Sequence, residues 1–460
     1  MDVEFLSRLQ FAVTAMFHYI FPPFSIGMGL LMVIFESLFL ITKKPIYERI
    51  TRFWIKIFAA NFSVGVATGI VLEFEFGTNW ATYSRYVGDI FGSPLAAEGI
   101  FAFFLESGFL AILLFGWNRV SKPMHLFATC MVFIGSVLSG FWIVVANSWQ
   151  QTPVAYELVM HNGIERAVIT DFWEMVFNPS SLVRFQHVIF GAFVQGAFLV
   201  ISVSAYYLLK NKYTDFAKRS LKIAMIVATV TSLLQLLLGD LSAQIVRKYQ
   251  PSKMAAMEGV FETQKNAPLY IMGWVDEEKR ETKGLAIPGM LSLLSYGTTE
   301  GEIKGLNDIP EENWPKVNAT FQTYHIMVAI GMLLIALTLY STYLMARKKL
   351  FEKKWLLKIF VVSVVLPVAA NQLGWVTAEI GRQPWVVYGL LKTAHGVSKA
   401  VTAPEVLTSL ILFFLVYILL FFVWIYVLDK EIKHGPEHFE DAPYAGFSRK
   451  EDRLDSFENK

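Results

Sequence analysis

Nine long apolar stretches limit what this chain can fold into. They lie at roughly 11–41, 54–76, 96–117, 124–146, 184–209, 221–240, 322–345, 357–379 and 404–428. A helix needs about 20 consecutive apolar residues to cross a bilayer, and soluble chains do not repeat such stretches. Together with a hydrophobic content of 55%, the pattern predicts an all-α integral membrane protein with nine transmembrane helices. The first stretch is long enough for a tilt or for a kink at Pro22–Pro23.

The distribution of basic residues predicts the orientation. Every second connection is rich in Lys and Arg: Lys43, Lys44, Arg49 and Arg52; Arg119 and Lys122; Lys210, Lys212, Lys218 and Arg219; Arg347, Lys348, Lys349, Lys353 and Lys354. Because cytoplasmic connections carry the excess of positive charge, we expect the N-terminus outside and the C-terminus in the cytoplasm. The N-terminus lacks the basic start and cleavage site of a secretory signal, so the first stretch is predicted to be a retained helix.

The connections divide the chain into four parts. Residues 1–240 would hold helices 1 to 6, 241–321 a long outer loop, 322–428 helices 7 to 9, and 429–460 a charged cytoplasmic tail. The long loop opens with a helical pattern over 251–264. The other outer connections are 77–95, 147–183 and 380–403, of which 147–183 is predicted to be an ordered surface segment.

Charge and cysteine content exclude several classes of protein. A formal charge of +2 excludes a strongly basic nucleic-acid binder. A single cysteine, Cys130, excludes a disulfide framework, a CxxCH haem attachment and a thiolate iron–sulfur site. Any redox cofactor would therefore be held by His, Met or carboxylate side chains.

Five potential ligands or ionisable groups fall at one depth, toward the predicted outer side of the membrane. They are His18, Glu98, His187, Met327 and Glu379. Ionisable groups within a membrane are costly, which favours a functional interpretation. Histidine is the commonest metal ligand, and methionine pairs with it on haem. A lone histidine or methionine is otherwise a packing residue.

Three carboxylates have neighbours that suggest their chemistry. Arg382 lies three residues after Glu379, on the same helical face, and would keep that carboxylate ionised. The alternative is an ion pair that only fixes helix register. Glu98 and Glu106 are eight residues apart and step inward along one face, as in a proton relay. Alternatively, they are buried acids bonded to hydroxyl or backbone groups.

These residues stand in segments that resemble subunit I of the cytochrome bd-type quinol oxidases, in a short-loop form. The segments cover nearly the whole chain: Arg8-Leu-Gln-Phe with His18, Glu98-Gly with Ala102-Phe-Phe-Leu-Glu106-Ser, Ala146-Asn-Ser-Trp-Gln-Gln-Thr-Pro153, Arg184-Phe-Gln-His187, His325-Ile-Met327 and Gly374-Trp with Ala378-Glu-Ile-Gly-Arg-Gln-Pro-Trp385. The last, with its membrane glutamate before Gly-Arg-Gln-Pro-Trp, is the most specific.

The resemblance implies nine helices that hold three haems near the outer face. It makes His187 and Met327 the axial ligands of a low-spin haem b. His18 and Glu379 would each hold one of two high-spin haems, one of b type and one of d type. Which residue holds which haem stays open, as does replacement of haem d by a further haem b.

The resemblance also assigns roles around the haems. Glu98 and Glu106 match acids credited with charge compensation and proton delivery, and Lys253 and Glu258 match residues credited with quinol oxidation. Three further positions, close to the haems, are matched by Asn147, Trp375 and Arg382.

The implied reaction is oxidation of membrane quinol at the outer face and reduction of O2 to water, with charge separation but no proton pump. The implied partners are a multi-span subunit II and a small single-helix subunit, in the bacterial cytoplasmic (inner) membrane.

One position departs from the pattern of the family, and three other classes of protein would leave different patterns in the sequence. Where some members of the family carry Arg, two residues before the ligand methionine, this chain has His325, which could compete with Met327 for the iron.

A haem–copper oxidase or a bc-type cytochrome would need histidine sets that this chain lacks. A proton-coupled transporter would be expected to show inverted repeats, and none is visible.

Overall fold

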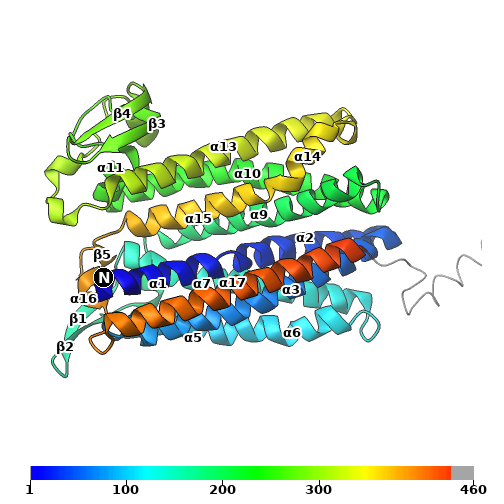
Figure 1. Cartoon of the computed structure of the whole chain (residues 1–460), viewed down its shortest axis with the longest axis horizontal. Helices are drawn as coiled ribbons and strands as arrows, with labels where there is room; N and C mark the ends of the chain where they lie inside the picture. The colour runs from blue at the N-terminus through cyan, green and yellow to red at the C-terminus, as the bar shows by residue number, and fades with distance from the viewer. Residues whose placement is uncertain (1, 437–460) are drawn as a thin grey trace, which may run out of the picture.

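The computed structural model describes residues 2–436, most of which lie in long helices that run side by side (Figure 1). Within that range, nine helical segments are long and apolar enough to cross a membrane, as predicted: Val3–Thr42, Pro45–Gly77, Gly88–Phe115, Lys122–Gln151, Ser181–Leu209, Thr214–Tyr249, Glu311–Ala346, Lys354–Ile380 and Ala403–His434. The predicted tail, 429–460, begins inside the last of these helices, and its residues 437–460 lie outside the described range.

The spans comprise α1 (Val3–His18), α2 (Phe21–Thr42), α3 (Pro45–Gly77), α5 (Gly88–Ala97), the π-helix η1 (Glu98–Phe103), α6 (Phe104–Phe115), α7 (Lys122–Gln151), α9 (Ser181–Leu209), α10 (Thr214–Tyr249), α13 (Val317–Ala346), α14 (Lys354–Ser363), α15 (Val365–Ile380) and α17 (Ala403–His434). The connections hold α4 (Ala81–Tyr86), β1 (Tyr156–His161), β2 (Ile164–Ile169), α8 (Phe172–Val176), α11 (Pro251–Glu258), β3 (Leu269–Asp276), β4 (Glu281–Ile287), α12 (Met290–Tyr296), β5 (Trp385–Val387), β6 (Leu391–Lys392) and α16 (Thr393–Gly396). Single 3-10 turns, η2 to η4, lie at Leu306–Asp308, Glu311–Asn313 and Leu350–Glu352.

Within residues 2–436, three spans are interrupted away from their ends, each beside a proline or a functional candidate. The first breaks at Tyr19–Ile20, just before Pro22 and Pro23, because neither ring nitrogen can donate to the carbonyl four residues earlier. The predicted kink thus lies one turn ahead of the prolines. The third span passes through the π-helix η1, which begins at Glu98. The eighth breaks between α14 and α15, three residues before Pro367.

Several helices extend further into the connections than the hydropathy pattern predicted. The third span begins at Gly88 rather than at 96, and α10 continues to Tyr249 rather than ending at 240. The first residues of the predicted 241–321 loop are therefore helical. The helical pattern over 251–264 forms only α11, because Gly259 takes a left-handed conformation (φ 66°) that ends the helix.

Close helix packing holds the bundle together. The helices α2 and α9 cross at Gly27 and Gly196, where a Cβ atom on either residue would come within 2.3–2.4 Å of backbone atoms of the other helix. Small residues let membrane helices approach in this way, because lipid gives no hydrophobic drive for helix association. A single core of buried residues extends from this crossing over α2, α3, α9, α10 and α14.

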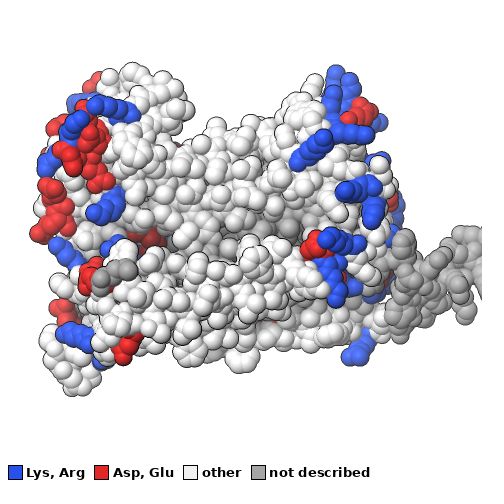
Figure 2. Space-filling model, in the orientation of Figure 1, with Lys and Arg blue, Asp and Glu red and all other residues white. Residues whose placement is uncertain are grey.

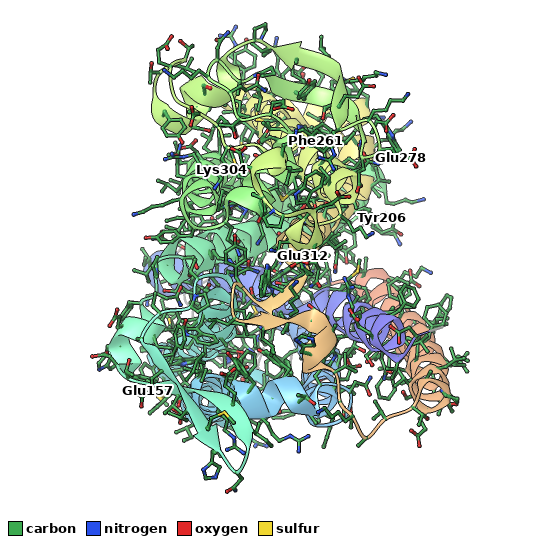
Figure 3. All side chains as sticks on the ribbon, turned by 90° about the vertical axis from the view of Figure 1, so that its left-hand side faces the viewer. Glu157, Tyr206, Phe261, Glu278, Lys304 and Glu312 are labelled. Carbon is green, nitrogen blue, oxygen red and sulfur yellow. The ribbon has the colours of Figure 1, made fainter. Side chains whose placement is uncertain are left out.

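The two ends of the bundle differ. One, the hairpin end, carries the antiparallel pairs β1–β2 and β3–β4, with β3–β4 beside α11 (Figures 1 and 3). In Figure 3, Glu157 marks the β1–β2 side of this end, and Phe261 and Lys304 mark the other. The opposite end, the basic end, holds the short Lys- and Arg-rich connections. Figure 2 shows a broad uncharged belt between them, mixed charge at the hairpin end and mostly Lys and Arg at the basic end.

Candidate functional site

Glu379 lies in the last turn of α15 and is the centre of a hydrogen-bond network. Its carboxylate accepts from Asn147 Nδ2 (3.0 Å), from Gln151 Nε2 (3.5 Å) and from the Arg382 guanidinium. Arg382 also donates to Gln150 Oε1 (3.2 Å). Asn147, Gln150 and Gln151 all lie in the last turns of α7, so one short segment of that helix positions the carboxylate.

A second guanidinium adds positive charge to this network. Arg184 of α9 donates to Asn147 Oδ1 at 2.6 Å and lies 6.0 Å from the ring centre of Trp375. Two guanidiniums therefore face one carboxylate. The Arg382 side chain is 5% exposed, whereas that of Glu379 keeps 35% of its surface accessible. This surplus of positive charge beside an accessible carboxylate suits an anionic group such as a haem propionate.

His18, at the end of α1, is held with one nitrogen engaged. Its Nδ1 lies 3.0 Å from Thr68 Oγ1, and that hydroxyl donates to the backbone carbonyls of Val64 (2.9 Å) and Gly65 (3.0 Å). Since the hydroxyl proton is committed, Nδ1 is the donor and Nε2 is left with its lone pair. Histidines that bind a metal through one ring nitrogen typically donate the other N–H to a neighbouring acceptor in this way, which fixes the orientation of the ring.

Glycines make room beside three of the candidate ligands. A Cβ atom on Gly69 would lie 3.2 Å from His18 Cε1, and one on Gly374 would lie 3.0 Å from Met327 Sδ. On Gly239 it would lie 3.7 Å from His187 Cε1. The missing Cβ atoms let these side chains lie directly against the neighbouring helices. An imidazole or thioether held in this way is a donor that suits haem iron.

His187 lies on α9 and contacts α10 beside Gly239, and Met327 lies on α13 and contacts α15 beside Gly374. Gln235 Nε2 of α10 lies 3.2 Å from both ring nitrogens of His187, and the buried Gln235 Oε1 has no hydrogen-bond partner among the residues that the structure describes. An unpartnered acceptor beside an imidazole can take its N–H, which would leave the other ring nitrogen for a ligand.

His325 is not available as a ligand. Its Nδ1 lies 2.9 Å from the Phe321 carbonyl oxygen, and its Nε2 lies 2.8 Å from the Tyr270 carbonyl oxygen of β3. Both nitrogens point at acceptors, so the ring ties β3 to α13. This geometry argues against competition with Met327.

Glu98 and Glu106 both face α7. Ser139 donates to Glu98 Oε1 at 2.6 Å, and Ser136 is hydrogen bonded to Glu106. Gly135 lets Glu106 approach, since a Cβ there would lie 2.5 Å from Glu106 Cγ. The two acids thus share one face of α7, and among residues 2–436 neither has a cation in hydrogen-bond contact.

Lys253 and Glu258 are buried on α11, with exposures of 3% and 2%. Lys253 Nζ donates to Gln151 Oε1 at 2.5 Å. Burial, with the guanidiniums of Arg184 and Arg382, lowers the pKa of Lys253 well below its ordinary value. Burial raises the pKa of Glu258 to about 8, against a hydrogen bond from Tyr324.

Two features of the site were not singled out in the sequence. Gln151 bridges Lys253 and Glu379, and Tyr83 of α4 accepts from Gln150 Nε2 at 2.5 Å. The double glutamine after Trp149 was the available signal for the first. Nothing in the sequence pointed to Tyr83.

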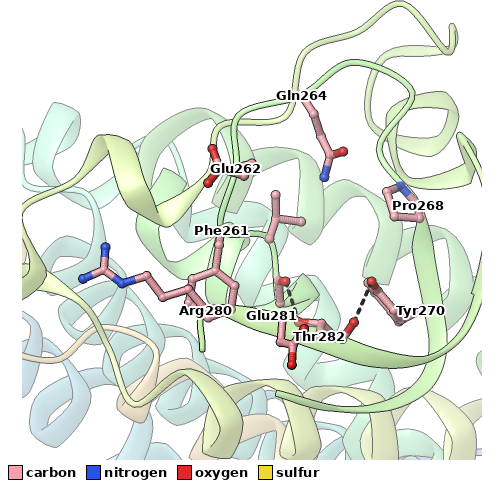
Figure 4. A pocket seen from close by; sticks show the side chains of 10 residues that line it. Phe261, Glu262, Gln264, Pro268, Tyr270, Arg280, Glu281 and Thr282 are labelled. Carbon is pink, nitrogen blue, oxygen red and sulfur yellow. Dashed lines mark hydrogen bonds between the residues drawn. The ribbon is translucent and has the colours of Figure 1, made fainter. Parts of the chain in front are cut away.

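Two further features bear on where ligands bind. Within residues 2–436, no three His, Cys, Asp or Glu side chains form a group that could hold a bare metal ion. The candidate ligands His18, His187, Met327 and Glu379 lie on α1, α9, α13 and α15. The loop that begins after Glu258 contains a pocket, whose lining residues include Phe261, Tyr270, Arg280 and Thr282 (Figure 4). It contains none of the candidate residues.

Comparisons with known proteins now decide the family. A family model for cytochrome bd terminal oxidase subunit I matches residues 6–436. The chain belongs to this family. A relative named cytochrome bd ubiquinol oxidase subunit 1, from Bacillus subtilis, is 41% identical, with 94% of each chain covered. The Escherichia coli cytochrome bd-II ubiquinol oxidase subunit 1 is 35% identical, covering 95% of this chain and 97% of the relative.

A solved structure supports the same assignment. The bd oxidase from Geobacillus thermodenitrificans matches with a TM-score of 0.88 at 32% identity, covering 95% of this chain and 99% of that chain. As a member of the cytochrome bd family, the chain is a multi-pass membrane subunit of a terminal quinol oxidase, a quinol:oxygen oxidoreductase. Haem cofactors and a second subunit follow from the same membership.

Proposed function

We propose that this subunit binds three haems at the hairpin end of the bundle, with His187 and Met327 on a low-spin haem b and His18 and Glu379 each on one high-spin haem. The observation that carries the proposal is the Lys253–Gln151–Glu379 connection, which joins the candidate quinol residues to a candidate iron ligand. The haems, when bound, would supply one-electron transfer and oxygen reduction.

The chain's own residues account for ligand geometry and charge. Thr68 orients His18, and Gln235 is placed to orient His187. Arg382, with Asn147, holds Glu379 ionised and in place, and Trp375 lies beside Arg184. We propose haem b and haem d at the high-spin positions, or haem b at both, with either residue on either haem.

Lys253 and Glu258 would accept the quinol protons. The neutral form of Lys253, which its lowered pKa favours, and the ionised form of Glu258, whose pKa is raised to about 8, can each accept a proton. Within the described part of the chain, the buried Glu258 Oε2 has no hydrogen-bond partner, so it would be able to accept from a quinol hydroxyl. The substrate is proposed as a membrane quinol, since the relatives' names include both ubiquinol and menaquinol.

The proposed orientation puts the hairpin end outside and the basic end in the cytoplasm of a bacterial inner membrane. The charge distribution in Figure 2 supports it by the positive-inside rule. Quinol protons would leave on the outside, while protons for water enter from the cytoplasm past Glu106 and Glu98. Each charge moved is worth about 2.3 kcal/mol per 100 mV, so no pump is required. A small single-helix subunit is proposed beside subunit II.

The test is a reduced-minus-oxidised visible spectrum with haem extraction on the wild-type complex and on Met327→Ala and Glu379→Ala. We expect selective loss of the low-spin signal in the first variant and of a high-spin signal in the second. Leu333→Ala, a change on the exposed face of α13, is the control and should retain both signals. A preparation without haem would overturn the proposal.

A further inference from the structure

A third acid lies against α7, much closer to the basic end than Glu98 and Glu106. Glu36 of α2 and His125 of α7 are each 1% exposed. Glu36 Oε1 lies 2.7 Å from His125 Nδ1, and Glu36 Oε2 accepts from Thr129 Oγ1 at 2.5 Å. His125 Nε2 lies 3.2 Å from the Leu113 carbonyl oxygen. These three side chains, Glu36, His125 and Thr129, are called the inner cluster.

The inner cluster is in line with the acids of the proposed proton path. His125, Thr129, Ser136 and Ser139 are spaced by four, seven and three residues, which puts them on one face of α7. Along that face, His125 and Thr129 bind Glu36, Ser136 binds Glu106, and Ser139 binds Glu98. One helix therefore aligns three carboxylates over about 21 Å, at 1.5 Å per residue.

The cluster begins one turn inside the membrane-facing part of α7. His125 N donates to the carbonyl of Ser121, the N-cap residue at the basic end. Trp117 covers the imidazole of His125, with ring centres 3.8 Å apart. The guanidinium of Arg52, on α3, lies 4.3 Å from the centre of the Trp117 ring. Arg52 is itself paired with Glu48 and a quarter exposed, so the Trp117 ring and this ion pair connect His125 with the accessible surface at the basic end.

We propose that the inner cluster is the cytoplasmic start of the proton path, so that this subunit contains its own route from the basic end to Glu106 and Glu98. His125 would take a proton at Nε2 and release the Nδ1 proton to Glu36 Oε1. Glu36 would pass a proton through the Thr129 hydroxyl, which accepts one proton and gives up its own. This inference rests on the proposed function, in which those protons form water.

The charges around the cluster favour transfer of protons over a static ion pair. Besides His125, the titratable groups that face Glu36 are Cys130 on α7 and, behind Trp117, Arg52 on α3. Lys122 lies further away, with its Nζ 4.7 Å from the ring centre of Phe39, one turn after Glu36. No Lys or Arg within residues 2–436 is hydrogen bonded to Glu36. Glu379, by contrast, forms an ion pair with Arg382.

One gap must be crossed. Thr129 and Ser136 are seven residues apart, about 10 Å along the axis, and the buried Val132 lies between them. The two glutamate side chains shorten this distance from both sides, and a proton would cross the remainder on bridging water. Val132 is therefore the narrowest point of the path and a second place to test it.

The experiment compares Glu36→Gln with Glu75→Gln in the purified complex, reconstituted in vesicles. Glu75 is the matched control: it is also 1% exposed and accepts from a threonine, Thr14, at 2.6 Å, but it lies at the hairpin end. We expect Glu36→Gln to slow oxygen consumption and proton uptake from the basic side about 10- to 100-fold. The haem spectrum should be unchanged, and the solvent deuterium isotope effect should increase. Glu75→Gln should keep the wild-type rate.

Two further variants separate the outcomes. His125→Gln should slow proton uptake like Glu36→Gln, and Val132→Thr, which adds a hydroxyl at the gap, should not slow it. Equal slowing by Glu36→Gln and Glu75→Gln, or an unchanged rate in Glu36→Gln, would overturn the inner path. If Glu106→Gln slows turnover while Glu36→Gln does not, only this inference fails. If neither does, the proposed proton delivery fails as well.

Discussion

Two kinds of buried carboxylate lie in this bundle, and their neighbours differ. Glu379, at the hairpin end, is bound by a guanidinium and by amides. Glu106 and Glu36, along α7, contact hydroxyl groups and an imidazole. A guanidinium favours the ionised form, whereas hydroxyls leave a buried acid free to hold a proton. The first environment suits a fixed ligand, and the second suits a group that gains and loses protons.

Removing the guanidinium should have the largest effect. Arg382→Leu would leave the partly exposed Glu379 carboxylate without its guanidinium partner, at a cost below the about 3–5 kcal/mol typical of a fully buried pair. We expect loss of one high-spin haem and of oxygen consumption, as measured by haem extraction and an oxygen electrode. Arg382→Lys, which keeps the charge, should retain part of both. Full haem content in Arg382→Leu would show that Glu379 does not depend on this pair.

Glu106→Gln should slow turnover about 100-fold and leave the haem spectrum nearly intact, because the amide keeps the shape but cannot carry a proton. Oxygen consumption and the visible spectrum would be measured on the same preparation. Glu4→Gln, at the surface of α1, is the control. Loss of the haems in Glu106→Gln would assign this acid a structural role instead.

Glu258 should give quinol oxidation a pH dependence of roughly tenfold. Its pKa is raised to about 8, so the carboxylate that accepts a proton is scarce at neutral pH and grows as pH rises through 8. The rate at limiting quinol should therefore increase over that range in the wild type and stay flat in Glu258→Gln. A rate that falls between pH 7 and 8 would contradict this sign.

Thr68→Val should have the smallest effect. It removes one hydrogen bond to His18, worth about 1 kcal/mol, without removing the ligand. We expect a small shift of a high-spin band and of its midpoint potential, in spectroelectrochemical titration. Thr229→Val removes a hydroxyl that is hydrogen bonded to Thr342 between α10 and α13, and it should shift neither the high-spin band nor the midpoint potential. Equal shifts in both variants would exclude an orienting role for Thr68.

The sequence predicted the number of helices because each span is a long apolar run, and it predicted the family from short polar segments on those runs. Helix ends were less accurate: α10 continues to Tyr249 since a helix needs no apolar residues once it leaves the membrane. Partners across helices were not predictable either. The Thr68–His18 and Glu36–His125 contacts join residues 50 and 89 positions apart, and only packing brings them together.

The π-helix η1 has a consequence for how length changes in this span would act. A π-turn contains one residue more than an α-turn, so deleting one residue, such as Gly99, would restore a regular helix. The wider turn accommodates the extra residue locally, so the helix on either side would keep its face after such a deletion. An insertion or deletion elsewhere between the two acids would instead rotate Glu98 by about 100° relative to Glu106, away from Ser139. The phase between the two acids thus depends on where along the span a residue is lost.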